Sequence, residues 1–176
     1  MALVVFLRGV NVGGHRRFRP SILSSQLKEY GILNIGAAGT FVVCKPVSKT
    51  RLRSELSRWL PFKAEVMICT GKELIEAAAS SPFDGKLPGR DIVRFVSVLA
   101  KPPRILPSLP LCIPANGRWL LRILAAHDRF IFGLYRREMK AISGLGNIGK
   151  LFGSPATTRN WNTMNTILEV LDSNSD

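Results

Sequence analysis

The sequence predicts an α+β protein in which a ferredoxin-like β-α-β-β-α-β subdomain is followed by a second, smaller α+β subdomain. Short apolar runs alternate with amphipathic helical segments over the first 81 residues, and a stretch rich in Pro, Gly and Asp follows. The remaining residues combine β-prone runs with an amphipathic C-terminal segment. We therefore expect two subdomains, residues 1–81 and 82–176, with their boundary within residues 82–89.

The first subdomain begins with a strand and a helix. Residues 2–7 form a short apolar run, which is typical of a buried strand. A helix is expected from Pro20, because Pro is favoured at the first helical position and apolar residues recur at i, i+4 and i+7 from Leu23. Gly31 closes this helix.

The next segments complete the β-α-β-β-α-β order. Residues 32–35 and 40–45 predict a hairpin across a glycine-containing turn. Ser48 can cap a second helix, which Pro61 ends. Residues 64–69 then predict the fourth strand.

The following elements lead into the second subdomain. Thr70 and Glu73 have the spacing of a capping box and predict a short helix. Residues 91–99 are strongly β-prone, and residues 118–125 and 129–135 predict a hairpin. In that hairpin, Arg122 falls on the solvent-facing side of an alternating strand.

The last segments are less regular until the C-terminus. The many prolines in residues 101–114 exclude a continuous helix. Residues 136–141 and 145–152 predict short helices, and a final helix is expected from about Thr158 with Trp161 on its apolar face.

A glycine-rich turn follows the first strand. Gly9 and Gly14 have the outer spacing of a phosphate-binding loop, but His15 and Arg16 stand where that loop needs Lys followed by Ser or Thr. The mismatch argues against phosphate-loop catalysis. Two interpretations stay open, namely an anion cradle of backbone N–H groups and a strand-to-helix connection that needs small residues to turn.

Two stretches resemble the signatures of a known family. Residues 6–14, FLRGVNVGG, are similar to the LLRGINVGG that opens members of the mostly bacterial domain-of-unknown-function family 1697. Residues 155–163, PATTRNWNT, are similar to the C-terminal signature of the same family. The resemblance implies a shared fold and two landmarks, and it implies no established activity.

Charge is the main compositional anomaly. The chain carries 25 Lys and Arg against 12 Asp and Glu, a net charge of +13, which favours anionic partners such as phosphorylated ligands or nucleic acid. The excess is spread along the chain, so a generally basic surface is the competing interpretation.

Other compositional features narrow the class of protein. Cys44, Cys69 and Cys112 lie in apolar surroundings without metal-site spacing, so we expect buried thiols, a cytoplasmic protein and no metal or other cofactor. The apolar runs fall far short of a membrane span, so we expect no membrane partner. The sequence leaves the oligomeric state open.

The two signatures together define a candidate anion-binding site. Thr157 to Asn160 are expected at a helix start, where unpaired N–H groups favour an anion, although a plain helix cap with a solvated arginine is the alternative. If the two stretches meet, the arginines supply planar donors and the glycines allow close backbone approach. The predicted site residues are Arg8, Asn11, Gly13, Gly14, Arg159, Asn160 and Asn162.

The functional prediction follows from charge and from this site. We expect a binder of an anionic ligand, either phosphorylated or nucleic acid. The alternative is an enzyme that acts on a small phosphorylated or carboxylated substrate. No catalytic residues are assigned, because the sequence contains no recognisable nucleophile with an adjacent base.

Overall fold

The computed structural model describes residues 1–10, 17–85 and 89–175, and it mixes helices with antiparallel sheets. The chain divides into two compact units, the first made of residues 1–75 and 165–176 and the second of residues 76–164. Through residue 79 the elements are β1 (Leu3–Arg8), α1 (Pro20–Gln26), the 3-10 helix η1 (Lys28–Tyr30), β2 (Ile32–Asn34), β3 (Thr40–Val43), α2 (Lys49–Trp59), β4 (Glu65–Thr70) and α3 (Gly71–Ala79). After residue 79 they are β5 (Ile92–Leu99), β6 (Leu111–Ile113), β7 (Leu121–His127), β8 (Phe130–Arg136), α4 (Met139–Leu145), α5 (Ile148–Phe152), β9 (Ala156–Asn160) and α6 (Trp161–Ser173).

The first unit has the predicted ferredoxin-like topology. Its four strands lie in the order β2-β3-β1-β4, and every neighbouring pair is antiparallel. Val4 of β1 is therefore opposite Val42 of β3 on one side and Cys69 of β4 on the other. The α+β class and the β-α-β-β-α-β order are confirmed.

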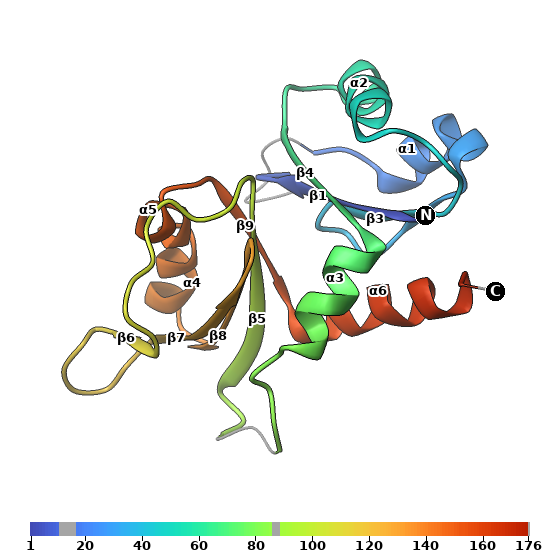
Figure 1. Ribbon diagram of the computed structural model, residues 1–176. Coiled ribbons are helices and arrows are strands. Elements are labelled where there is room, and N and C mark those ends of the chain that lie inside the picture. Colours follow the sequence, from blue (N-terminus) through green and yellow to red (C-terminus); the bar gives the residue numbers. More distant parts are fainter. Residues whose placement is uncertain (11–16, 86–88, 176) are drawn as a thin grey trace. The chain divides into compact units, whose positions relative to one another are not determined.

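Strand β1 is buried on both faces, which explains its unbroken apolar run. One face packs with α1 and α2, which lie together on one side of the sheet (Figure 1). The apolar side chains of this contact are Leu3, Val5 and Leu7 from β1, Leu23 from α1, and Leu52 and Leu56 from α2. Val4 and Phe6, which point to the opposite face, are also buried.

Local signals at the helix ends act as the sequence predicts. The Ser48 Oγ atom accepts a hydrogen bond from Arg51 N at 3.1 Å and caps α2. Gly31 has a φ of 61° and ends η1 in the left-handed region.

The second half of helix α6 belongs to the first unit. A Cβ built on Gly71 would lie 2.8 Å from Cδ2 of Leu171, so the Leu171 side chain packs closely against the backbone of Gly71. The last turns of α6 thus pack with residues 1–75 in the same compact unit.

The second unit contains a five-stranded antiparallel sheet in the order β6-β7-β8-β5-β9. One face packs against α4 and α5 through Phe95, Leu121, Ile123, Ile131, Ile148 and Phe152. Gly133 of β8 lies within this core, where a Cβ would come within 2.5 Å of Phe95 Cζ and 2.6 Å of the Arg122 carbonyl oxygen. The absence of a side chain at Gly133 makes room for the Phe95 ring.

The structure corrects the expected start of the last helix. Residues 156–160 form strand β9, which pairs with residues 95–99 of β5, and the helix begins only at Trp161. The helix prediction left the backbone N–H groups of this stretch unpaired at a helix start. In the structure, backbone hydrogen bonds to β5 pair this stretch instead. The short strand β6, between the prolines of residues 101–114, was also not predicted.

Within the described ranges, no helix has both the length and the apolarity needed to cross a membrane.

Candidate anion-binding site

The N-terminal part of the predicted site lies in the first unit. Arg8 ends β1, and its Nη1 atom donates to Glu65 Oε2 at 2.8 Å across the β1–β4 pair. Both side chains are exposed, so this ion pair is screened and easily exchanged. Asn11, Gly13 and Gly14 lie outside the described residues.

Arg159, from the C-terminal part of the predicted site, is buried in the second unit. Its Nη1 atom donates to Thr157 Oγ1 at 2.8 Å and to the Thr158 carbonyl oxygen at 2.9 Å. Burial lowers the pKa of Arg159 to about 10. The guanidinium is thus held by its own strand, and the solvated arginine of the alternative interpretation is wrong.

The neighbouring asparagines have different roles. Asn160 Oδ1 accepts from Thr163 N at 2.8 Å, so Asn160 supplies the cap that the sequence placed at Thr157 or Thr158. Asn162 is exposed on the first turn of α6. Arg159, Asn160 and Asn162 are brought together in the second unit, and their meeting with Arg8 of the first unit stays a prediction.

Trp161 is part of an aromatic cluster in the second unit. Its ring lies 5.0 Å from that of Phe83 and 6.3 Å from that of Phe132, in edge-to-face arrangements. Trp161 therefore packs among apolar side chains, as expected for a core residue. Its side chain is only half-buried, however, so it is not fully enclosed.

Three arginines besides Arg159, which is paired with Val96 of β5, lie on the face of the five-stranded sheet that points away from α4 and α5. The register pairs Arg94 of β5 with Leu134 of β8, and Leu134 with Arg122 of β7. Arg136 lies two residues beyond Leu134 on the same face of β8. We call Arg94, Arg122 and Arg136 the arginine face; Leu134, buried to 7% exposure, lies at its centre.

Two members of the arginine face are held by protein acceptors. Arg94 Nη2 donates to the Gly85 carbonyl oxygen at 2.7 Å. Arg136 Nε donates to the Trp119 carbonyl oxygen at 2.8 Å, and its Nη1 atom contacts Asp91 Oδ2 at 3.0 Å.

Arg122 differs from both. Its side chain is half-buried and its Nε atom is fully buried, yet among the described residues its guanidinium has no hydrogen-bond or ion-pair partner. A buried N–H group of a charged side chain without an acceptor costs about 1–3 kcal/mol or more. Arg122 is therefore a donor that the described residues leave unsatisfied.

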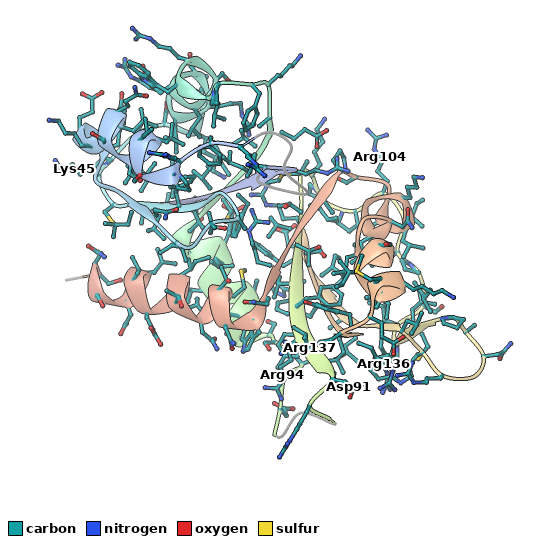
Figure 2. All side chains as sticks on the ribbon, turned by 180° about the vertical axis from the view of Figure 1, so that it is seen from behind. Lys45, Asp91, Arg94, Arg104, Arg136 and Arg137 are labelled. Carbon is teal, nitrogen blue, oxygen red and sulfur yellow. The ribbon has the colours of Figure 1, made fainter. Side chains whose placement is uncertain are left out.

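Acidic groups neutralise only part of this region. Asp91 contacts Arg136, and Glu138 Oε1 lies 2.6 Å from Arg118 Nη2. The hydrogen bond from Arg136 lowers the pKa of Asp91, and that from Arg118 lowers the pKa of Glu138, so both carboxylates are ionised at neutral pH. Figure 2 shows Asp91 with Arg94, Arg136 and Arg137 at one end of the sheet.

The charge of the two units differs. By sequence, residues 76–164 carry 13 basic and 5 acidic side chains, a net charge of +8. Residues 1–75 and 165–176 together carry 12 basic and 7 acidic side chains, a net charge of +5. The second unit is thus the more basic of the two, and it contains the arginine face.

The first unit offers a different kind of surface. A pocket of about 420 Å³ is lined by Met1, Ala2, Cys44, Gly71, Lys72, Ile75, Leu171, Asn174 and Ser175. Lys72 is the one basic side chain in this described lining, and burial raises the pKa of the Cys44 thiol. The lining is less suited to an anion than the arginine face.

The described cysteines and acidic groups do not form a metal centre. In the part of the chain that the structure covers, no three His, Cys, Asp or Glu side chains come together in a group that could hold a metal ion. Cys69 is buried as expected, whereas Cys44 and Cys112 are only half-buried.

Comparison with known proteins places the chain in a family. The family model described as a protein of unknown function (DUF1697) matches residues 1–107, which is more than half of the chain. The chain belongs to this family. The DUF1697 match confirms the family that the resemblance indicated, while no protein with a curated description matches the sequence.

A solved structure supports the fold of this DUF1697 member. The conserved bacterial protein SP0830 from Streptococcus pneumoniae is similar in structure, with a TM-score of 0.56 and 17% sequence identity. The similarity covers 97% of this chain and 98% of that protein. At this identity the likeness extends to the fold alone.

The arginine face was not among the predicted site residues. The alternation of the strand around Arg122 did indicate a solvent-facing arginine. The missing information was the register of β5, β8 and β7, which brings Arg94, Arg122 and Arg136 to one face.

Proposed function

We propose that this DUF1697 member binds an anionic ligand, phosphorylated or nucleic acid, at the arginine face of its second unit. The observation that carries the proposal is Arg122, a half-buried arginine whose guanidinium lacks an acceptor within the described chain. A ligand oxygen can supply that acceptor.

The chemistry of the surrounding groups favours phosphate. Guanidinium groups present planar donors that match phosphate oxygens in a bidentate geometry. Arg94 and Arg136 are held in place by carbonyl oxygens, which limits the side-chain entropy lost on binding. A ligand at Arg122 would thus enter a positively charged and partly ordered surface.

The site predicted from the two signatures has weaker support. Arg8 is already paired with Glu65, and Arg159 is already bonded to Thr157 and Thr158. Those arginines have protein partners, so the composite site remains a prediction and the arginine face is the preferred location.

Titration calorimetry with inorganic tripolyphosphate tests the proposal. We expect Arg122→Ala to weaken binding by about tenfold or more, since charge-assisted hydrogen bonds contribute about 1.5–3 kcal/mol. Arg58→Ala, on α2 of the first unit, removes the same charge from an exposed position and serves as the control.

Two further comparisons, the salt dependence of binding and the Arg58→Ala control, separate binding at the arginine face from general attraction to a basic surface. Binding should weaken as salt is raised, because charge attraction is screened. Equal affinity of the Arg122→Ala and Arg58→Ala proteins would remove the arginine face as the site and leave only general attraction to a basic surface.

A further inference from the structure

Aromatic rings accompany two of the three arginines on the arginine face. The Cζ atom of Arg136 lies 4.4 Å from the centre of the Trp119 ring, and that of Arg94 lies 5.5 Å from the centre of the Phe83 ring. Both distances are within the range of cation–π contacts. Two of the three arginines on this face are therefore each in contact with an aromatic ring.

Of the two arginine–aromatic contacts, the one between Arg136 and Trp119 is supported by more additional interactions. Arg136 stacks on the ring of Trp119 and also donates to its carbonyl oxygen at 2.8 Å. Asp91 binds the same guanidinium at 3.0 Å. The ring and the guanidinium are thus fixed together, and Trp119 is half-buried two residues before β7 begins.

The arginines of the arginine face are far enough apart to bind more than one phosphate group of a ligand. Arg94 and Arg122 lie on strands separated by one intervening strand, which places their backbones about 10 Å apart. Arg136 occupies the strand between them. Donors distributed in this way can follow a chain of phosphates.

We infer that the ligand of the arginine face is single-stranded nucleic acid, with phosphates on Arg94 and Arg122 and a base stacked beside Trp119 and Arg136. The inference rests on the proposed function and specifies its ligand. Single-stranded binding sites combine basic grooves with aromatic or guanidinium planes, and only an unpaired base exposes its face for stacking.

The sheet of the first unit does not offer this arrangement. In ferredoxin-like RNA-binding modules, bases stack on aromatic residues of the open sheet face. Here the face opposite α1 and α2 is apolar and buried, through Val4, Phe6, Val42, Met67 and Cys69. Nucleic acid is therefore assigned to the second unit.

Three probes test the inference on the full chain: a fluorescein-labelled ten-nucleotide uridine strand, a duplex of equal length, and inorganic tripolyphosphate. We expect Trp119→Leu to weaken binding of the single strand by about 5- to 150-fold, the range for loss of one stacked base. Binding of tripolyphosphate should be unchanged.

Trp59→Leu is a matched control. Trp59 also has an arginine over its ring, with Arg58 Cζ 5.1 Å from the ring centre, but it lies on α2 of the first unit. The Trp59→Leu protein should bind all three probes as the wild type does. Equal losses in the Trp119→Leu and Trp59→Leu proteins would overturn the inference.

Fluorescence provides a second readout if Trp119→Leu fails to fold. The chain has three tryptophans, so replacing Trp59 and Trp161 by Phe leaves Trp119 as the reporter. Its emission should be quenched by the uridine strand and not by tripolyphosphate. Absence of quenching at saturation with the single strand would overturn the inference.

The outcomes separate the inference from the proposed function. Tripolyphosphate binding that depends on Arg122, without any effect at Trp119, would retain the anion site and reject the base-stacking site. Tighter binding of the duplex than of the single strand would also reject the inference. Failure of all three probes to bind would reject both.

Discussion

Arg159 shows how burial changes the role of a charged side chain. Its guanidinium is enclosed and bonded to Thr157 and Thr158, so we expect Arg159→Ala to lower the free energy of unfolding by about 1–3 kcal/mol. Thermal unfolding measures the loss, and Arg137→Ala, at an exposed position, should change stability by no more than about 0.5 kcal/mol. Equal melting temperatures of the two variants would contradict a structural role for Arg159.

The same residue separates what sequence can and cannot predict. Its position in a polar run beside Trp161 indicated a helix start and an exposed or ligand-binding charge. Burial was decided by pairing with Val96 on β5, a partner more than 60 positions away in the chain. Propensity and spacing contain no signal for such a contact.

Among the secondary-structure elements, α3 carries the clearest local signal. Thr70 N donates to Glu73 Oε2 at 2.6 Å, and Glu73 N donates to Thr70 Oγ1 at 3.1 Å, so the predicted capping box is confirmed. Lys49 Nζ lies 3.2 Å from the same carboxylate oxygen and links α2 to α3.

This capping box makes stability depend on pH. Burial alone would raise the pKa of Glu73, but the hydrogen bonds from Thr70 and the contact with Lys49 outweigh it and lower the pKa. The stabilisation is therefore complete above the ordinary glutamate pKa and is lost as pH falls through the lower folded-state value. Glu73→Gln should cost about 1 kcal/mol at pH 7 and progressively less in acid.

Urea unfolding at a series of pH values checks this expectation. The exposed carboxylate of Glu169 on α6 provides the control, and Glu169→Gln should change stability by no more than about 0.5 kcal/mol. A Glu73→Gln deficit that is as large at low pH as at pH 7 would contradict the role of the ionised carboxylate.

Elements with strong local signals were predicted well, and elements that depend on distant partners were not. Apolar periodicity and helix-end signals predicted α1, α2 and α3 correctly, because the residues that form these patterns lie close together in the sequence. Strand β6 has only three residues, and its pairing with β7 defines it. The arginine face depends on the same kind of long-range pairing, so its arginines could not be grouped from the sequence.

At the scale of the molecule, the first unit is discontinuous. Residues 165–176 complete it after the chain has formed the whole second unit. A fragment of residues 1–81 lacks Leu171, which packs at Gly71, together with the buried Ile167. We expect this fragment to unfold at lower urea concentration than one in which a Gly/Ser linker joins residues 1–75 to residues 165–176.

Circular dichroism during urea titration compares the two fragments. The joined fragment should show a sharper transition and should bind less of a dye that reports exposed apolar surface. Identical midpoints would indicate that the C-terminal residues add nothing to the first unit.

The position of both chain ends in one unit has a mechanical consequence. A force applied between residue 1 and the C-terminal segment acts directly on the first unit, because both attachment points belong to it. The second unit, inserted between residues 75 and 165, carries no tension until the first unit has opened. Stretching of single molecules from their ends should therefore extend the chain in two ordered steps, with the basic second unit yielding last.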